Sequence, residues 1–431
     1  MPGGFVCISG VYMELYELKE EAERVILVGV STRENEDVQD SLDELEELVE
    51  TAGAQTVGRV IQSREGIHPG YYVGTGKLEE IRMAIQALEA TGIVCDDELS
   101  PSQINNLERE LECKVMDRTV VILDIFAARA KTSEGKIQVE LAQLRYRAAR
   151  LTGLGTSLSR LGGGIGTRGP GEKKLEMDRR LIKTRISQLK RELEQVKRHR
   201  ELLREGRKKD NLLTGAIVGY TNAGKSTLLN TLTHAGVLEE DKLFATLDPT
   251  TRVLELPGKQ KIYLTDTVGF IRKLPHHLIE AFKSTLEEAK YADVIIHVVD
   301  ASNPQMDQQM HVVYETLKEL GVKDKKVVTL FNKQDKISGE EIFRDFQADY
   351  VLKISARTGE GLEDFKKVME KILIENQIYL ERNYSYREAG KIQLIRKYGQ
   401  LLSEEYTPEG IYVKARVPAN IYGQIEEDPK G

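Results

Sequence analysis

The sequence has no tryptophan and only three cysteines, Cys7, Cys95 and Cys113, among its 431 residues. Three scattered cysteines are too few for a disulfide framework, and they lack the spacing of a zinc site. No apolar run reaches the roughly 18 to 20 residues that a membrane-spanning helix requires. The segment Met1 to Glu20 lacks a basic stretch followed by an apolar one, so we expect no secretory signal. These absences predict a cytoplasmic protein without a membrane span.

The composition is that of a folded protein with several domains. Hydrophobic residues form 40% of the chain and charged residues 30%. Such a composition can build buried cores, and it excludes a disordered or collagen-like chain. At roughly 150 residues per domain, the length is enough for about three domains.

Charge is distributed unevenly along the chain. Residues 129–209 contain 23 basic and 9 acidic residues, a net charge of +14, whereas the whole chain carries −7. The rest of the chain therefore carries −21. A basic block in an acidic protein is a candidate surface for nucleic acid. It is equally typical of a solvated coiled-coil face, and charge alone leaves both interpretations open.

The first part of the chain, residues 1–125, alternates between strand and helix patterns. Arg24 to Val30 is an apolar run with the length of a buried strand, and Ser100 followed by Pro101 is a good helix start. Val115 to Leu123 closes this segment. The alternation predicts a small α/β domain. Tyr71 to Lys77 carries two glycines ahead of a helix, and we favour a plain turn there over a phosphate site.

Residues 126–209 predict two helices, each with one narrow apolar seam. Ile137 and Ile182 each begin a series with spacings of 4, 3, 4 and 3. We expect the two helices to pack within one chain as an antiparallel hairpin, which favours a monomer. The glycine-rich loop 152–171 between them contains Arg160 and Arg168. We favour RNA contact by this loop over the alternative of a flexible linker, because the loop lies at the tip of a basic hairpin.

A phosphate-binding loop begins at Gly219. The run Gly219 to Ser226 reads G-x-x-x-x-G-K-S, and it follows an apolar strand and precedes a helix. Its glycines allow backbone N–H groups to surround phosphates. Lys225 reaches the β and γ phosphates, and the Ser226 hydroxyl is a ligand for Mg²⁺. The pattern predicts a nucleoside triphosphate site.

Guanine specificity is indicated by N-K-x-D at Asn332 to Asp335, after a strand predicted at Val327 to Phe331. The Asp335 carboxylate can accept hydrogen bonds from guanine N1–H and from its exocyclic amine. Adenine lacks both donors there, so an adenine site would leave the carboxylate unpaired. Ser355, Ala356 and Arg357 follow a further strand and fit a loop that supports the base.

The run D-T-V-G ends another predicted strand. Asp266 would hold Mg²⁺ through water, and the Gly269 N–H could meet the γ-phosphate, which would couple hydrolysis to a loop movement. A threonine should complete the metal shell. The candidates are Thr246, Thr250 and Thr251.

These motifs, in this order, resemble the HflX family, translation-factor-class P-loop GTPases close to the Obg group. The matching stretches are GYTNAGKSTLLN, FATLDPTTR, DTVGFI, NKQD, SAR, GGGIGTRGPGE and HPGYYVGTGK. The resemblance implies binding to the large ribosomal subunit in the GTP-bound form and the ability to split ribosomes. It also places Thr246 ahead of Thr251 as the metal ligand.

The sequence patterns, together with the resemblance, predict four parts and a set of site residues. The parts are the α/β domain (1–125), the basic hairpin (126–209), the GTPase domain (210–376) and a small α+β domain (377–431). Lys225 and Gly269 are the expected catalytic contacts, and Ser226, Thr246 and Asp266 the expected Mg²⁺ ligands. The expected nucleotide contacts are Gly219, Tyr220, Thr221, Asn222, Ala223, Gly224, Lys225, Ser226, Thr227, Phe244, Ala245, Thr246, Leu247, Asp248, Asp266, Thr267, Val268, Gly269, Asn332, Lys333, Asp335, Ser355, Ala356 and Arg357.

Phe270 stands where many GTPases have the glutamine that orients the attacking water. We therefore expect slow intrinsic hydrolysis that a partner accelerates. Asn222 could hold K⁺ near the phosphates, although bracing the loop is the simpler role. The expected function is a ribosome-associated GTPase, with GTP, GDP and the large subunit RNA as partners. The alternatives are a switch that binds a protein and no RNA, and an assembly factor without splitting activity.

Overall fold

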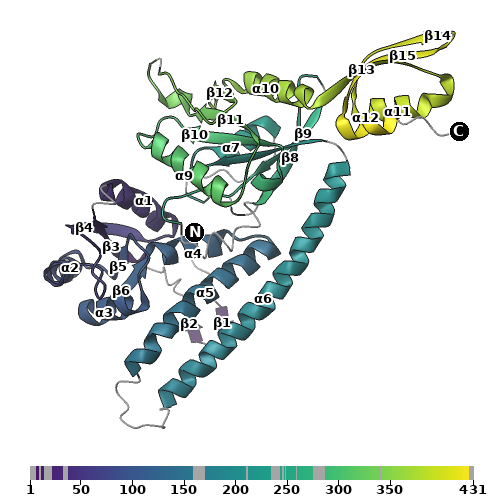
Figure 1. Ribbon diagram of the computed structural model, residues 1–431. Coiled ribbons are helices and arrows are strands. Elements are labelled where there is room, and N and C mark those ends of the chain that lie inside the picture. The colour runs from purple at the N-terminus through teal and green to yellow at the C-terminus, as the bar shows by residue number, and fades with distance from the viewer. Residues whose placement is uncertain are drawn as a thin grey trace. The chain divides into compact units, whose positions relative to one another are not determined.

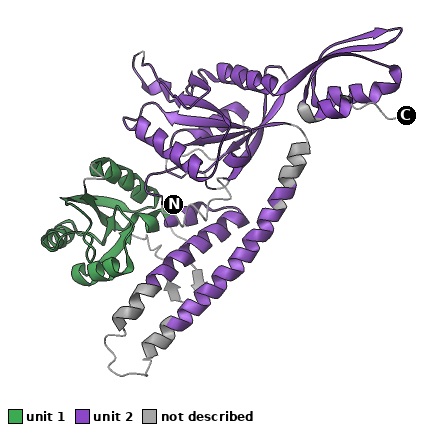
Figure 2. Cartoon of the chain, in the orientation of Figure 1, with its two compact units in different colours: residues 1–122 green, residues 123–431 purple. Residues whose placement is uncertain are grey.

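The computed structural model describes residues 6–8, 11–13, 22–32, 37–158, 170–209, 212–233, 243–244, 247, 249–258, 260–274, 287–339 and 341–426 (Figure 1). The chain divides into two compact units, residues 1–122 and 123–431 (Figure 2). Each unit is considered by itself.

Unit 1 contains a four-stranded parallel sheet in the order β4-β3-β5-β6. Because the buried strand β3 alternates its side chains, Gly29 faces α1 while Ile26 and Val28 join the core beneath α2 and α3 (Figure 1). The elements are β1 (Val6–Ile8), β2 (Val11–Met13), β3 (Arg24–Ser31), α1 (Val38–Thr51), β4 (Gln55–Ser63), α2 (Thr75–Leu88), β5 (Gly92–Cys95), α3 (Pro101–Leu111) and β6 (Lys114–Asp117).

Two local predictions for this unit can be compared with the structure. Ser100 caps α3 in a capping box with Gln103, and Pro101 occupies the first turn, as expected. The closing segment Val115 to Leu123 divides between β6 and α4 (Arg118–Arg129), and α4 continues past the end of unit 1.

The predicted antiparallel hairpin is confirmed in unit 2 by α5 (Ser133–Leu158) and α6 (Pro170–Lys209). Leu141 packs against Leu189 and Leu193 in the seam. Glu140 pairs with Arg185 at 2.7 Å, and Glu134 pairs with Arg200, so the chain direction reverses between the helices. The seam is the apolar series that the sequence predicts.

The expected bounds of the loop, residues 152–171, were wrong at both ends. Helix α5 continues to Leu158 and α6 begins at Pro170, so Gly153 and Gly155 are helical. A glycine inside a helix costs only about 1 kcal/mol relative to alanine, which packing of the rest of the helix can offset. Residues 159–169, including Arg160 and Arg168, lie outside the described residues.

The nucleotide-domain sheet in unit 2 has six strands in the order β12-β11-β10-β7-β9-β8, all parallel except β8. Helices α7 and α10 pack on one face and α9 on the other (Figure 1). The elements are β7 (Leu213–Gly219), α7 (Lys225–Thr233), β8 (Thr250–Glu255), β9 (Lys261–Asp266), β10 (Val294–Asp300), α9 (Met306–Glu319), β11 (Lys326–Asn332), η1 (Gln334–Lys336), β12 (Tyr350–Lys353) and α10 (Leu362–Glu375). Strands β7, β9, β10 and β11 end at one edge, where parallel sheets bind ligands.

The last part of unit 2 is the predicted small α+β fold, a three-stranded antiparallel sheet in the order β13-β15-β14. Ile392, Ile395 and Ile421 of its helices pack on Val413 and Ala415 of the sheet. The elements are β13 (Gln377–Tyr384), η2 (Tyr386–Glu388), α11 (Ala389–Tyr398), β14 (Gln400–Thr407), β15 (Gly410–Pro418) and α12 (Ala419–Glu426).

Candidate nucleotide-binding site

The phosphate loop runs from the end of β7 to the start of α7. Two of its glycines are required by their surroundings. A Cβ at Gly219 would lie 2.2 Å from the Val298 carbonyl oxygen, and one at Gly224 would lie 2.3 Å from Asn332 Nδ2. Both glycines have positive φ, as does Asn222 at +59°. The loop therefore has a backbone shape that larger residues at positions 219 and 224 would disrupt.

Lys225 is buried in the first turn of α7, and its Nζ donates a 2.7 Å hydrogen bond to the Tyr220 carbonyl. Burial lowers the pKa of this lysine to about 8, against the opposing attraction of Asp266. A buried ammonium held by its own loop is suited to binding phosphate oxygens. Burial disfavours the protonated form of the lysine, and a nearby anion favours it again.

Ser226 and Asp266 come together as the sequence predicts. The Ser226 hydroxyl donates to Asp266 Oδ2 at 2.8 Å, and Asp266 is fully buried at the end of β9. A hydroxyl beside a carboxylate is an oxygen donor set that fits Mg²⁺, with phosphates and water completing the shell. Within the described ranges, no group of three or more His, Cys, Asp or Glu residues could hold a metal by itself.

The first switch segment is described only in part. Ala245, Thr246 and Asp248 lie outside the described residues. Phe244 and Leu247 are buried, and the Phe244 ring meets Phe126 edge to face at 4.6 Å between centroids. The Thr251 hydroxyl lies 2.9 Å from the Thr265 hydroxyl within the β8–β9 pair.

Phe270 packs against the phosphate loop. Its carbonyl accepts from Thr221 N at 2.8 Å, and its N–H donates to the Gly219 carbonyl at 3.1 Å. Its ring is buried. A Cβ at the preceding Gly269 would lie 2.9 Å from the Cα of Thr221 in the phosphate loop, so a larger residue at position 269 would displace that backbone. Phe270 therefore acts through its backbone and packing, which explains how an apolar residue occupies this position.

The base side of the site is organised by Asn332. Its Nδ2 donates to the Ala223 carbonyl, and its Oδ1 accepts from Ala356 N, both at 2.8 Å. Asp335 accepts a 2.6 Å hydrogen bond from the Ser355 hydroxyl. That bond, aided by Arg357, lowers the pKa of the Asp335 carboxyl and keeps it an acceptor.

Three more of the predicted contacts lie in the described part of the domain. Thr227 follows Ser226 in α7, Thr267 donates to the Ile217 carbonyl at 2.7 Å, and Val268 is buried. Arg272 and Asp300, which the sequence analysis did not select, also belong to this region. The Tyr220 hydroxyl accepts from Arg272 N, and Asp300 pairs with Lys333. The position of Asp300, at the end of a strand beside β11, was the available signal.

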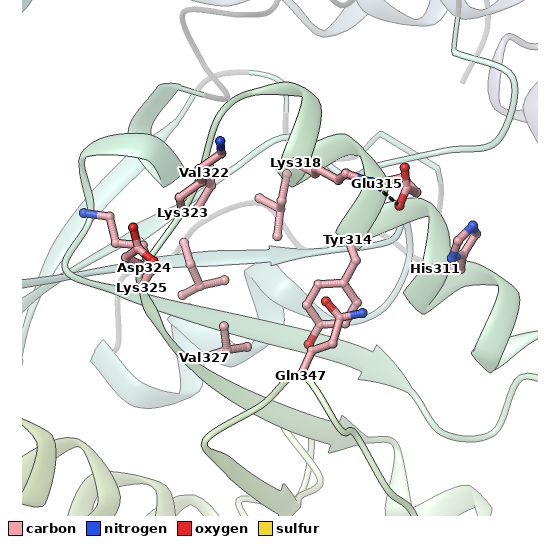
Figure 3. A pocket seen from close by; sticks show the side chains of 12 residues that line it. His311, Tyr314, Glu315, Lys318, Val322, Lys323, Asp324, Lys325, Val327 and Gln347 are labelled. Carbon is pink, nitrogen blue, oxygen red and sulfur yellow. Dashed lines mark hydrogen bonds and ion pairs between the residues drawn. The ribbon is translucent and has the colours of Figure 1, made fainter.

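A separate cavity of about 370 Å³ lies in the same domain (Figure 3). Ile295 and Val327 line it from the amino ends of β10 and β11, and Lys318, Lys323 and Lys325 stand around it (Figure 3). The nucleotide motifs lie at the opposite, carboxyl ends of these strands. The cavity is therefore distinct from the nucleotide site.

A mostly parallel sheet that presents a phosphate loop and an N-K-x-D loop at one edge, joined by a buried asparagine, defines a guanine-nucleotide-binding domain of the P-loop class. Three family models match the chain in succession. They are described as "GTP-binding GTPase N-terminal" at residues 39–127, "GTP-binding GTPase Middle Region" at 129–207 and "50S ribosome-binding GTPase" at 214–333.

The chain is 69% identical to the GTPase HflX of Lacrimispora saccharolytica, over 96% of this chain and 98% of that protein. It is 44% identical to the GTPase HflX of Escherichia coli, over 83% and 85% respectively. A crystal structure of SsGBP with GDP aligns with 82% of this chain and 99% of its own, at 28% identity and a TM-score of 0.46. The chain belongs to the HflX family of GTPases, which confirms the resemblance drawn from its motifs.

None of the helices in the described ranges combines the length and apolar character that crossing a bilayer requires.

Proposed function

We propose that this GTPase binds the large ribosomal subunit in its GTP form, splits or recycles ribosomes, and leaves after hydrolysis. The observation that carries the proposal is a basic antiparallel hairpin joined in one chain to a guanine-nucleotide domain. The family model for that domain, "50S ribosome-binding GTPase", supports it. We further propose the four-part division at residues 125, 209 and 376, a monomeric state and a cytoplasmic location.

The hairpin supports an RNA contact through its exposed charge. On the part of α6 whose side chains are described, the exposed basic residues include Arg180, Lys183, Lys190, Arg191 and Arg198. Phosphate neutralisation by such residues releases counterions, so binding to RNA should weaken steeply with salt. The segment between the two helices, residues 159–169, would add glycine backbone and the arginine donors Arg160 and Arg168.

We propose that the site residues act as their motifs suggest. Lys225 neutralises charge on the phosphates, Gly269 N–H contacts the γ-phosphate, and Asn332, Lys333 and Asp335 bind the base. Ser226, Thr246 and Asp266 would hold Mg²⁺, which would supply positive charge against the negative charge that develops on the phosphates. Because Phe270 offers no group to orient water, intrinsic turnover should be slow and the ribosome should accelerate it.

K⁺ use at Asn222 is a further part of this proposal. Asn222 has a positive φ and lies in the loop that would surround the phosphates. Turnover should rise when K⁺ replaces Na⁺ at equal ionic strength, because the ion would supply positive charge where an arginine finger acts. Equal turnover in the two salts would remove this role.

The decisive experiment measures GTP turnover with and without purified large subunits at 50 and 200 mM salt. We expect strong acceleration that declines at the higher salt. Splitting is then tested by incubating intact ribosomes with the protein and a non-hydrolysable GTP analogue and separating subunits on a sucrose gradient. Acceleration without splitting would favour the assembly-factor alternative. No acceleration and no co-sedimentation would favour a switch with a protein partner.

A further inference from the structure

The ends of β10 and β11 bring an acid to the lysine of the N-K-x-D motif. Asp300 lies opposite Asn332 in the parallel register of these strands. Asp300 Oδ2 is 2.7 Å from Lys333 Nζ, and the two side chains are only 13% and 16% exposed. The burial of this ion pair distinguishes it from the exposed pair of Lys318 and Glu315 in the same domain. Lys318 and Glu315 are 3.5 Å apart and 74% and 51% exposed.

Both oxygens of the Asp300 carboxylate are engaged. Oδ1 accepts hydrogen bonds from Ser302 N at 3.0 Å and from the Ser302 hydroxyl at 2.6 Å, which leaves Oδ2 directed to Lys333. The carboxylate is therefore fixed by the turn that follows β10. A partner held in this way restrains a long side chain more effectively than a mobile surface acid does.

Lys333 itself has little backbone freedom. It adopts the left-handed conformation, with φ +63° and ψ 34°. It also follows Asn332, whose side chain is bonded to Ala223 and Ala356, and it precedes η1, which carries Asp335. With its backbone held between these residues and its ammonium held by Asp300, the lysine stem has a restricted path beside the base site.

We propose that Asp300 is a positioning residue for nucleotide binding, which holds the Lys333 ammonium so that the lysine stem lies along the face of the guanine. The proposal depends on the assignment of Asn332, Lys333 and Asp335 to the base. Asp300 touches neither the base nor the phosphates. It acts through Lys333, and its removal leaves the lysine able to rotate away before the base binds.

The test compares the equilibrium affinities of wild type and Asp300→Asn for fluorescent GDP and GTP analogues. Asparagine keeps the size of the side chain and its bonds to the turn but loses the charge. We expect about tenfold weaker binding of both nucleotides, with unchanged turnover at saturating GTP. Asp300→Glu should recover part of the affinity. Glu315→Gln, which removes the exposed pair, is the matched control and should leave affinity unchanged.

A double-mutant cycle separates positioning from a purely structural role. In a Lys333→Met background, Asp300→Asn should cause no further loss of affinity, because its target is absent. An equal loss in both backgrounds, or an affinity for Asp300→Asn within twofold of wild type, would overturn the proposal.

The assignment of Asp335 to the base is tested separately by Asp335→Asn. This variant should bind GDP more weakly and should bind xanthosine diphosphate, the counterpart of GDP with xanthine as its base, more tightly. If Asp335→Asn leaves GDP affinity intact, the base assignment itself is wrong. If it weakens GDP binding while Asp300→Asn does not, only the positioning role fails.

Discussion

The side-chain amide of Asn332 donates a 2.8 Å hydrogen bond to the Ala223 carbonyl, which joins the base-binding loop to the phosphate loop. The same side chain accepts from Ala356 N, so three segments meet at one residue that is 2% exposed. The N-K-x-D loop and the phosphate loop are therefore structurally connected.

Replacing Asn332 by alanine should weaken GTP and GDP binding by about 10- to 100-fold. The change leaves the buried Ala223 carbonyl and the Ala356 N–H without this partner, so the phosphate loop and the N-K-x-D loop are no longer held in the shape that binds nucleotide. Isothermal titration with GDP measures the effect. Asn106→Ala is the control, since Asn106 Nδ2 also donates to a backbone carbonyl, that of Gly70, but lies in unit 1. A similar loss of affinity in both variants would contradict the expectation.

Gly224→Ala should abolish detectable nucleotide binding while the domain remains folded. The new Cβ would come within 2.3 Å of Asn332 Nδ2, and the alanine would have to adopt a φ of +95°. Gly321→Ala separates these effects, because Gly321 also has positive φ, +74°, but nothing lies within 4 Å of its Cβ position. The control should lose about 1–2 kcal/mol of stability and keep its affinity. Thermal unfolding and GDP titration of both variants check this.

His297 should make the domain less stable in acid. Burial in the middle of β10 lowers its pKa to about 4 from 6.5, partly opposed by Asp345. Between pH 6.5 and pH 4, His297 is therefore protonated in the unfolded chain but neutral in the folded one. The free energy of unfolding declines as the pH falls from about 6.5 toward 4. The full effect is on the order of 3 kcal/mol.

This dependence is measured by denaturant unfolding at pH 7, 6 and 5. His297→Gln cannot titrate, so its stability should change less with pH than that of the wild type. Parallel pH profiles for the two proteins would show that another group controls acid stability.

Phe126→Ala should reduce GTP-dependent association with the large subunit more than it reduces GDP affinity. The Phe126 ring meets Phe244, two residues before Thr246, so its loss frees the segment that should respond to the γ-phosphate. Such a truncation also costs about 3–5 kcal/mol of stability. Co-sedimentation with a GTP analogue and GDP titration separate the two effects. Phe346→Ala, at a ring that is 92% exposed, is the control. Equal losses of both activities would refute this role for Phe126.

The nucleotide-binding motifs could be predicted from the sequence because each motif is short and directly follows the strand that positions it. Gly219 to Ser226 needs only the end of β7 and the start of α7 to form its loop. The hairpin was readable for a similar reason, because a helix places residues three and four apart on one face. The loop bounds were not, since Gly153 and Gly155 signal a break that helix α5 tolerates.

The amino-acid sequence alone predicted a phosphate loop, a guanine-recognition motif, a Mg²⁺ donor pair and a basic hairpin. Only the tertiary structure decided how Asn332 reaches Ala223, how Asp300 reaches Lys333 and how Phe270 packs against the phosphate loop. Asn332 and Ala223 are 109 residues apart in the chain. Such contacts depend on the strand order β11-β10-β7-β9, which is set by the packing of the whole sheet and not by any local pattern.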